Sequence, residues 1–403
     1  MGTRPIPAAV LAVSAALIAL PQLSGQRLLP YMLDGRPPLN ATDLSIFDEE
    51  EELEELSCRV DKIDPILSFD FRFHAGYNLE IPLDELSGEH NRLTMIFRVT
   101  PTEPEGAPFY FVQGIRVPSI PEDAEGDTEL SGTFDLGEGK YDIAWMARDA
   151  HGNRCTDYWD LEADLSRGQQ DIQMEIAPGT AEESRGRQFL PEPLTERTPG
   201  ASRHIKFLVN VAPQDQDSSA LQSLDTLGVI MMMRRMMRNP EFTRFSVVAF
   251  NMEDQEIFYR QPETDEIDFP SLGKAVRKVE PGTVKLDTLE DKHSETKFLR
   301  DLILKEMEPP AEGGGAPDVI IFAGPKHLLD DNIDDDDLKP LAKQVHIPVF
   351  YVNYNLIPKE VPWRDGIGNA IRVFDGKEYA VHRPRDLQEA IADMVDRIVN
   401  SKQ

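Results

Sequence analysis

Side chains that carry oxygen atoms are the residues of this sequence best suited to hold a ligand. In the C-terminal half of the chain they are densest in one acidic run. The run reads Asp330-Asp-Asn332-Ile-Asp334-Asp-Asp-Asp337, and carboxylates at such spacing suit hard cations such as Ca²⁺. It carries Asp335 where a calcium loop needs glycine and Leu341 where the loop needs glutamate. Acidic residues also stabilise the N-terminus of a following helix. We therefore predict a helix start here and keep weak calcium or magnesium binding as the alternative.

Motifs for enzymatic chemistry are missing from the sequence. The eight histidines are scattered singly, so they do not form the paired histidines of a zinc protease. No Gly-x-Ser-x-Gly elbow occurs for a serine nucleophile, and Gly313-Gly-Gly315 precedes a predicted strand, whereas a phosphate loop opens a helix. We therefore expect a protein that is not an enzyme. An exported hydrolase stays as an alternative, which requires a nucleophile, a base and an acid to converge near the strand ends.

The charge and the first residues of the chain limit its partners and its compartment. A formal net charge of −30 over 403 residues repels nucleic-acid phosphates and anionic lipids, which are bound through lysine and arginine. Arg4 is followed by an apolar run from Ala8 to Leu20 and by small residues up to Gly25, the pattern of a secretory signal peptide over residues 1–25. The run is shorter than the roughly 20 residues that span a bilayer. We expect a secreted or periplasmic protein with no membrane span in the mature chain, or at most a tether formed by an uncleaved signal.

Cys58 and Cys155 are the two cysteines of the chain. In an oxidising compartment such a pair forms a disulfide, and these two bracket a strand-rich segment. Closing a loop of roughly 100 residues stabilises a fold by about 4–5 kcal/mol in the chain-entropy model. The sequence therefore predicts a Cys58–Cys155 bridge, with two separate buried thiols as the alternative.

The N-terminal half predicts a β-rich domain between two segments of low apolar content. Residues 26–56 carry the run Asp48-Glu-Glu-Glu-Glu-Leu-Glu-Glu55, whose self-repulsion predicts a disordered or loosely helical acidic leader. Residues 57–177 show short segments of period two between turns, which predict an antiparallel β-sandwich of immunoglobulin-like architecture. Residues 178–202 have the composition of a linker. The expected strands are Leu67–Phe73, Leu93–Val99, Phe109–Val112, Gly139–Trp145 and Asp171–Ile176.

Residues 203–403 alternate apolar strands with amphipathic helices, which predicts a doubly wound α/β sheet with helices on both faces. The first strand, His204–Pro213, leads through a polar loop into a helix that ends near Arg238. The other expected strands are Phe245–Phe250, Gln255–Tyr259, Asp318–Ala323 and Ile347–Val352, and the other expected helices are Leu272–Val279, Ser294–Met307, Leu338–Val345 and one that begins at Asp386.

This order of elements, with a β-hairpin after the first helix and a closing Asp-Leu-x-x-Ala-Ile helix, resembles a von Willebrand factor A-type domain over Arg203 to Val399. The arrangement with an N-terminal β-domain, together with the segments Phe71–Gly76 and His382–Asp386, is similar to poorly characterised exported proteins of environmental bacteria. The resemblance implies a Mg²⁺ or Mn²⁺ site built from Asp-x-Ser-x-Ser after the first strand, a threonine and a further aspartate. In this sequence those positions carry Asn210, Ala212, Gln214, Thr296 and Gly324, or Ala323 if the alignment slips by one.

Only Thr296 among these residues matches the family's ligands, so the resemblance implies an A-type domain without the usual metal or any other cofactor. The alternative is a displaced oxygen cluster at Asp215, Asp217 and Ser218, although such residues also cap helices. Tyr354 and Trp363 lie in a long irregular segment after the last predicted strand, which we expect to form a partner face. The sequence thus favours an exported, non-enzymatic interaction or scaffolding protein with a protein partner. Metal-dependent adhesion through the displaced cluster is the second hypothesis.

Overall fold

The computed structural model describes residues 26–400 apart from residues 33–34, 36, 89–90, 122, 185–186, 215–217, 219, 280–292, 309–314, 330, 355 and 357–363. The predicted signal peptide, residues 1–25, lies outside the described residues. The chain divides into two compact units. The first comprises Met1–Ile63, Gly76–Phe134 and Lys140–Leu161, and the second comprises Asp64–Ala75, Asp135–Gly139 and Glu162–Gln403.

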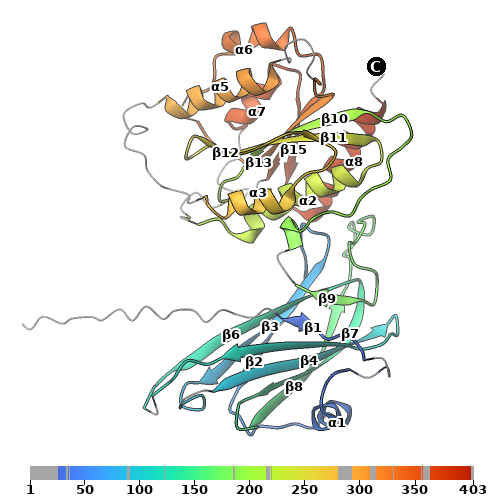
Figure 1. Ribbon diagram of the computed structural model, residues 1–403, viewed down its shortest axis with the longest axis vertical. Coiled ribbons are helices and arrows are strands. Elements are labelled where there is room, and N and C mark those ends of the chain that lie inside the picture. The colour runs from blue at the N-terminus through green and yellow to red at the C-terminus, as the bar shows by residue number, and fades with distance from the viewer. Residues whose placement is uncertain are drawn as a thin grey trace, which may run out of the picture. The chain divides into compact units, whose positions relative to one another are not determined.

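Two sheets pack face to face in the N-terminal part of the chain. Tyr77 in one sheet contacts Phe97 and Trp145 in the other, with ring centroids 5.8 Å and 5.3 Å apart. Edge-on aromatic contacts of this kind fill a sandwich core with large apolar area. One sheet has the order β1 (Arg27–Leu28), β5 (Phe109–Arg116), β4 (Arg92–Glu103), β7 (Gly139–Arg148) and β8 (Arg154–Ala163), and the other has the order β2 (Arg59–Leu67), β3 (Phe73–Pro82), β6 (Asp127–Leu136) and β9 (Ala181–Glu183) (Figure 1).

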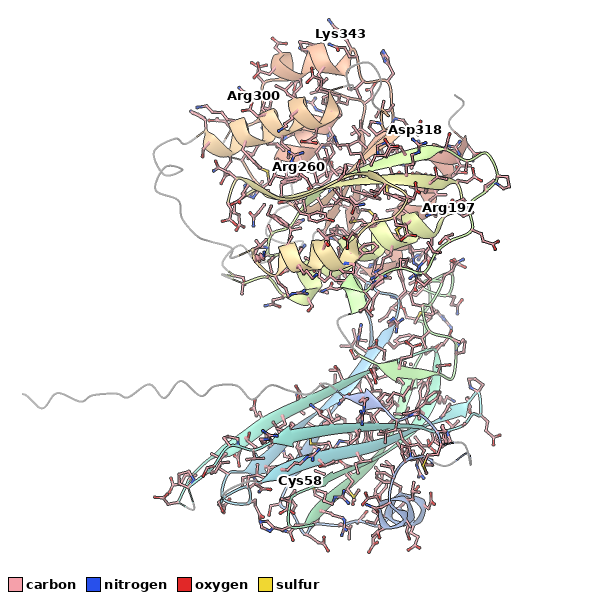
Figure 2. All side chains as sticks on the ribbon, in the orientation of Figure 1. Cys58, Arg197, Arg260, Arg300, Asp318 and Lys343 are labelled. Atoms are coloured by element: carbon pink, nitrogen blue, oxygen red, sulfur yellow. A yellow bond between two sulfur atoms is a disulfide. The ribbon has the colours of Figure 1, made fainter. Side chains whose placement is uncertain are left out.

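The predicted disulfide is confirmed. Cys58, labelled in Figure 2, directly precedes β2, and Cys155 lies in β8. Their Cα atoms are 6.4 Å apart and 97 residues separate them. The bridge therefore joins the two sheets of the sandwich.

The leader over residues 26–56 is not disordered, and of the two expected states the helical one holds for Ala41–Glu49. Helix α1 (Ala41–Glu49) begins after Asn40, whose side chain accepts a hydrogen bond from the Asp43 N–H. Ile46 and Phe47 of this helix are buried in a cluster with apolar residues of β4, β5 and β7. Asp43 lies 2.9 Å from Arg148. The apolar residues that precede the acidic run thus anchor the segment, and paired charges offset part of its self-repulsion.

Three other N-terminal expectations are corrected. The expected strand Leu67–Phe73 is broken by a turn over residues 68–72 between β2 and β3, where Phe71 adopts a left-handed backbone with φ of 56°. Asp171–Ile176 contains no strand residues. The linker predicted over residues 178–202 contains β9 and a 3₁₀ turn, Arg187–Phe189.

A six-stranded sheet organises the C-terminal part. Its order is β12 (Glu256–Thr264), β11 (Phe242–Asn251), β10 (Arg203–Asn210), β13 (Val319–Pro325), β14 (Val349–Tyr354) and β15 (Lys377–Val381). β11 and β12 pair antiparallel, and the other neighbours pair parallel. One face is covered by α5 (Ser294–Met307), α6 (Asp335–Ala342) and α7 (Gly366–Arg372), and the other by α2 (Ser223–Arg238), α3 (Phe269–Val276) and α8 (Pro384–Asn400) (Figure 1).

The chain is therefore a multi-domain, β-rich protein, and its described residues form three sheets. The inner strands β10, β13 and β14 are buried on both faces, which accounts for their nearly continuous apolar sequence. Within the part of the chain that the structure describes, no helix has the length and apolar character needed to cross a bilayer.

Candidate functional site

The carboxyl edge of the six-stranded sheet is where the expected metal motif lies. Asn210 ends β10 and is 1 % exposed. Its Oδ1 accepts a hydrogen bond from the Met252 N–H at 3.1 Å, and its Nδ2 donates to the Pro325 carbonyl oxygen at 3.4 Å. Both ends of the amide are thus used by the main chain of neighbouring segments. Asn210 acts as a structural link between strands.

Gly324 occupies the position of the family's last aspartate. Its φ is 148°, and a Cβ atom there would lie 2.3 Å from the carbonyl oxygen of Asn210. Such a separation is far inside van der Waals contact, so the close approach of β10 and β13 requires glycine. The position therefore has no room for the side chain of an aspartate ligand.

The remaining motif positions are engaged with the protein itself. Ala212 is buried. The Gln214 N–H donates to Asp225 Oδ1 at 2.9 Å, while Asp225 Oδ2 accepts from the Gln222 N–H at 2.7 Å. The Thr296 hydroxyl donates to the Asp331 carbonyl oxygen at 2.6 Å. The five motif positions therefore bring no carboxylate to this edge, and the one hydroxyl binds the main chain.

Asp215 and Asp217 of the displaced cluster, and Trp363 of the expected partner face, lie outside the described residues. The Ser218 hydroxyl donates to the Ala220 carbonyl oxygen at 2.9 Å and so closes a local turn. These observations leave the displaced cluster a prediction.

Tyr354 does not lie on an exposed face, contrary to expectation. It is 3 % exposed. Its ring fills space left by Gly228 of α2, where a Cβ atom would come within 2.3 Å of Tyr354 Cε1. The missing side chain of Gly228 is thus the physical reason for the burial of the ring.

A buried carboxylate that sequence reasoning missed lies near this edge. Asp365 is 1 % exposed and precedes α7, where it accepts hydrogen bonds from the Gly368 N–H at 2.9 Å, the His327 N–H at 3.0 Å and the Tyr351 hydroxyl at 2.8 Å. Burial raises the pKa of this carboxyl above its ordinary value. The sequence feature that could have indicated this residue is the Asp365-Gly366 pair, because aspartate often precedes the first residue of a helix. All three contacts are internal, so Asp365 holds the start of α7 and the segment after β13.

The acidic run behaves as the helix start that the sequence predicts. Asp334 caps α6 by accepting a hydrogen bond from the Asp336 N–H at 2.9 Å. The helix begins at Asp335, three residues earlier than expected. Asp336 also lies 2.6 Å from Lys339. The described carboxylates are therefore satisfied by helix capping and ion pairing.

A second group of ligating side chains, which the sequence did not indicate, gathers around the turn between β2 and β3. Asp70 and His74 flank the turn, and Asp135 comes from β6. His74 Nε2 lies 3.0 Å from Asp70 Oδ1, and His74 Nδ1 lies 2.8 Å from Asp135 Oδ1. Arg72 lies 3.5 Å from Asp135 and 2.8 Å from Glu182. The spacing Asp70-x-x-x-His74 was the only local signal, because Asp135 is distant in sequence.

This His74 cluster can be read as a metal site or as an ion-paired imidazolium. One ligating atom from each of Asp70, His74 and Asp135 lies within 4.8 Å of the others, which is close enough to hold a cation. Both ring nitrogens already face carboxylates, however, and a metal-bound imidazole has to give up one of its protons. Burial alone lowers the pKa of His74, but hydrogen bonds and the charges of Asp135 and Asp70 raise it to about 10. The arrangement therefore fits a protonated His74 better than a metal ligand.

Comparisons with known proteins assign no family to this chain. No family model and no curated protein sequence matches it. Among solved structures, a β-glucuronidase of Bacteroides uniformis is similar at 10% identity and a TM-score of 0.18, over 86% of this chain and 32% of that one. A glycosyl hydrolase family 2 member of Bacteroides cellulosilyticus is similar at 9% identity and a TM-score of 0.18, over 79% of this chain and 38% of that one. The chain thus spans about a third of the length of these proteins, and likeness at this level carries no argument about fold or function.

Proposed function

We propose that this chain is an exported interaction or scaffolding protein that joins an immunoglobulin-like β-domain to an A-type α/β domain. In this proposal the A-type domain acts without a metal ion at the carboxyl ends of its strands. The sheet order β12-β11-β10-β13-β14-β15, with helices on both faces and an antiparallel pair at β11–β12, supports the A-type assignment. The facing sheets and their inter-sheet disulfide support the immunoglobulin-like assignment.

The contact between Asn210 and Gly324 carries the metal-free part of the proposal. A hard cation needs several oxygen ligands at this edge. Both ends of the Asn210 side-chain amide are instead hydrogen-bonded to main-chain groups. A side chain at position 324 would collide with the main-chain carbonyl oxygen of Asn210. The usual ligand set therefore has neither the charge nor the room to form.

Exposed leucines at the same edge support a protein partner. Leu224, in the first turn of α2 after β10, is 47% exposed, and Leu328, which follows β13, is 48% exposed. β10 and β13 are parallel neighbours, so the segments that follow them emerge at one edge of the sheet. We take these two leucines as the apolar contacts that this edge offers to a protein partner. The net charge of −30 disfavours nucleic acid and anionic lipid as alternatives.

Site-specific photocrosslinking tests this function. A photoreactive amino acid at position 328 should give a crosslinked protein product in the cells that make the chain, and an excess of EDTA should not reduce it. The same group at position 194, where Leu194 is 86% exposed in the segment between β9 and β10, serves as the matched control. Leu224→Glu should reduce the product from position 328 about tenfold, the effect of losing about 1.4 kcal/mol of contact energy.

Two results would contradict the proposal. Equal products from positions 328 and 194 would mean that the strand edge has no special role. Loss of the product with EDTA would instead favour metal-dependent adhesion through Asp215 and Asp217.

A further inference from the structure

A cavity of about 590 Å³ opens on the face of the six-stranded sheet that carries α5. It lies beside the C-terminal end of that helix, where Glu306 and Met307 line it, and it is also lined by residues of β10 and β11. Its apolar lining includes Val248, Pro262, Met307 and Ile347. A cavity of this size suits a small organic ligand with an apolar body.

A serine and a histidine lie hydrogen-bonded in the wall of this cavity. Ser246 Oγ of β11 is 2.9 Å from His204 Nε2 of β10, and the two residues are 8% and 6% exposed. Ser246 is paired with Lys206 across the parallel ladder, so His204, two residues before Lys206, lies on the same face. This is the separation at which a histidine can take a proton from a serine hydroxyl.

Irregular strand pairing accompanies both residues. The β10–β11 ladder shifts register between Arg203 and His204, and the β11–β12 ladder shifts between Phe245 and Val247, on either side of Ser246. Irregularities of this kind re-aim side chains and occur often beside active sites.

A carboxylate faces the other side of the imidazole. Glu263 Oε2 lies 3.8 Å from His204 Nδ1, an ion-pair distance that is longer than a hydrogen bond. Arg244 holds the other oxygen of Glu263 at 2.6 Å. The main-chain N–H of His204 donates a hydrogen bond to Asp318 Oδ2 at 2.7 Å, which fixes the start of β10. Asp318 is labelled in Figure 2, just before β13.

The cationic side chains of the cavity are neutralised within it. Glu306 lies 2.9 Å from Lys206 and 2.6 Å from Arg260, which Figure 2 labels on β12. The lining also holds Glu263 and Glu308, so the cavity has no excess positive charge for an anionic ligand, and its apolar lining favours a neutral one.

We propose that Ser246 is a nucleophile and His204 its general base in an acyl-transfer site that takes small neutral esters with an apolar acyl group. His204 Nε2 removes the hydroxyl proton of Ser246, and Oγ forms a bond to the ester carbonyl carbon. The bond from that carbon to the alcohol oxygen breaks, and the alcohol leaves with the proton from Nε2. Water then adds to the acyl carbon while giving a proton to Nε2, and that proton returns to Oγ when the acyl–oxygen bond breaks. The balance is ester plus water to acid plus alcohol, and Glu263 positions the imidazole.

The first test uses the wild-type chain from Gln26 and a fluorophosphonate probe, which reacts covalently with activated serines. Peptide mapping should place the adduct on Ser246. Ser166, an exposed serine whose hydroxyl donates a hydrogen bond to Gln169 Oε1, is the internal control and should stay unlabelled. A folded chain that leaves Ser246 unlabelled, or that labels both serines equally, overturns the proposal without any variant.

The second test measures hydrolysis of p-nitrophenyl butyrate. Ser246→Ala and His204→Gln should each reduce the rate at least 100-fold, the usual range for losing a nucleophile or a general base, while Ser166→Ala should not change it. Glu263→Gln should lower kcat about tenfold with little change in KM, as expected of a positioning residue. A rate that is the same in wild type and Ser246→Ala overturns the proposal.

The pH profile separates catalysis from a structural role. Burial lowers the pKa of His204 below its ordinary value, and the charge of Lys206 lowers it further. The charges of Glu263 and Asp318 raise the pKa, but burial outweighs them. The rate should therefore rise with pH to a plateau, with its midpoint below pH 6.5, the ordinary histidine value. A rate that only increases in proportion to hydroxide across pH 5 to 9 overturns the assignment of His204 as base.

Discussion

His74 gives a quantitative test of how the turn between β2 and β3 is held. Its ring nitrogens lie 2.8 Å from Asp135 and 3.0 Å from Asp70, and although burial lowers its pKa, these two carboxylates raise the pKa to about 10. A histidine in the unfolded chain titrates near 6.5. The native state therefore binds the proton more tightly than the unfolded state. The resulting stability is fully present below about pH 6.5 and is lost as the pH rises from 6.5 to about 10.

The size of the effect follows from the difference between these two pKa values. A difference of that size corresponds to at most about 4–5 kcal/mol. The His74 side chain is 31% exposed, so solvent screens part of its interaction with the carboxylates. We expect a contribution of about 2–3 kcal/mol to the free energy of unfolding at pH 6.5, falling to near zero at pH 10.

Urea unfolding of the wild type and His74→Gln at pH 6.5, 8 and 10 measures this contribution. The variant should be less stable than the wild type at pH 6.5, and the two should converge at pH 10. His151→Gln, which changes an exposed histidine, serves as the control and should show no such convergence. A deficit that is the same at all three pH values would refute the reasoning. So would stabilisation of the wild type, but not the variant, by Zn²⁺, because that result would make His74 a metal ligand.

Three further predictions concern the disulfide, the strand edge and metal. Replacing Cys58 and Cys155 by serine should lower the free energy of unfolding by about 4–5 kcal/mol, because the bridge spans 97 residues, and an unchanged urea midpoint would contradict this. Gly324→Ala should cost at least about 2 kcal/mol through its clash with Asn210, whereas Gly152→Ala, at φ of 94° with nothing within 4 Å, should cost only about 1 kcal/mol in backbone strain; equal losses in thermal unfolding would exclude the clash. Mg²⁺, Mn²⁺, Ca²⁺ or EDTA should leave the thermal midpoint unchanged, whereas a ligand at a hundredfold excess over its Kd would add about 2.7 kcal/mol. A metal shift that Asp217→Ala removes would establish the displaced site instead.

Elements with a clear apolar face were predictable from the sequence. The helix expected over Ser294–Met307 has those bounds in the structure, because Leu299, Leu302 and Ile303 recur at helical spacing and are buried. Helix α7 and strand β15 were missed. Both are short, and β15 is an edge strand with one buried residue, Val381, so neither shows a full apolar period.

Local patterns misled where tertiary contacts decide the conformation. Alternating apolar residues over Leu67–Phe73 predicted a strand, yet Phe71 adopts a positive φ and forms a turn. The acidic run predicted disorder, but apolar burial of Phe47 outweighs the repulsion of exposed carboxylates. The His74 cluster could not be found at all, since Asp135 reaches it only through the pairing of distant strands.

The two ends of the strands in the six-stranded sheet differ in what their polar side chains do. Open α/β sheets place ligands at the carboxyl ends of their strands, so the search concentrated on Asn210 and the loop after it. That edge is occupied by main-chain hydrogen bonds and by the contact of Gly324 with Asn210. Two buried polar residues, His204 of β10 and Ser246 of β11, lie farther from that end, His204 being the second residue of its strand and Ser246 the fifth.

A buried hydroxyl and imidazole cost about 1–3 kcal/mol each unless they are hydrogen-bonded, and apolar residues could fill a purely structural core without that cost. The bond between Ser246 and His204 removes this cost at the hydroxyl and at Nε2 of the ring. It does not account for the cavity of about 590 Å³ beside the pair or for the register shifts that accompany both residues. A satisfied core pair needs neither feature, whereas a reacting pair needs both an aimed hydroxyl and space for its substrate. This difference is why the fluorophosphonate reaction at Ser246 separates the two roles.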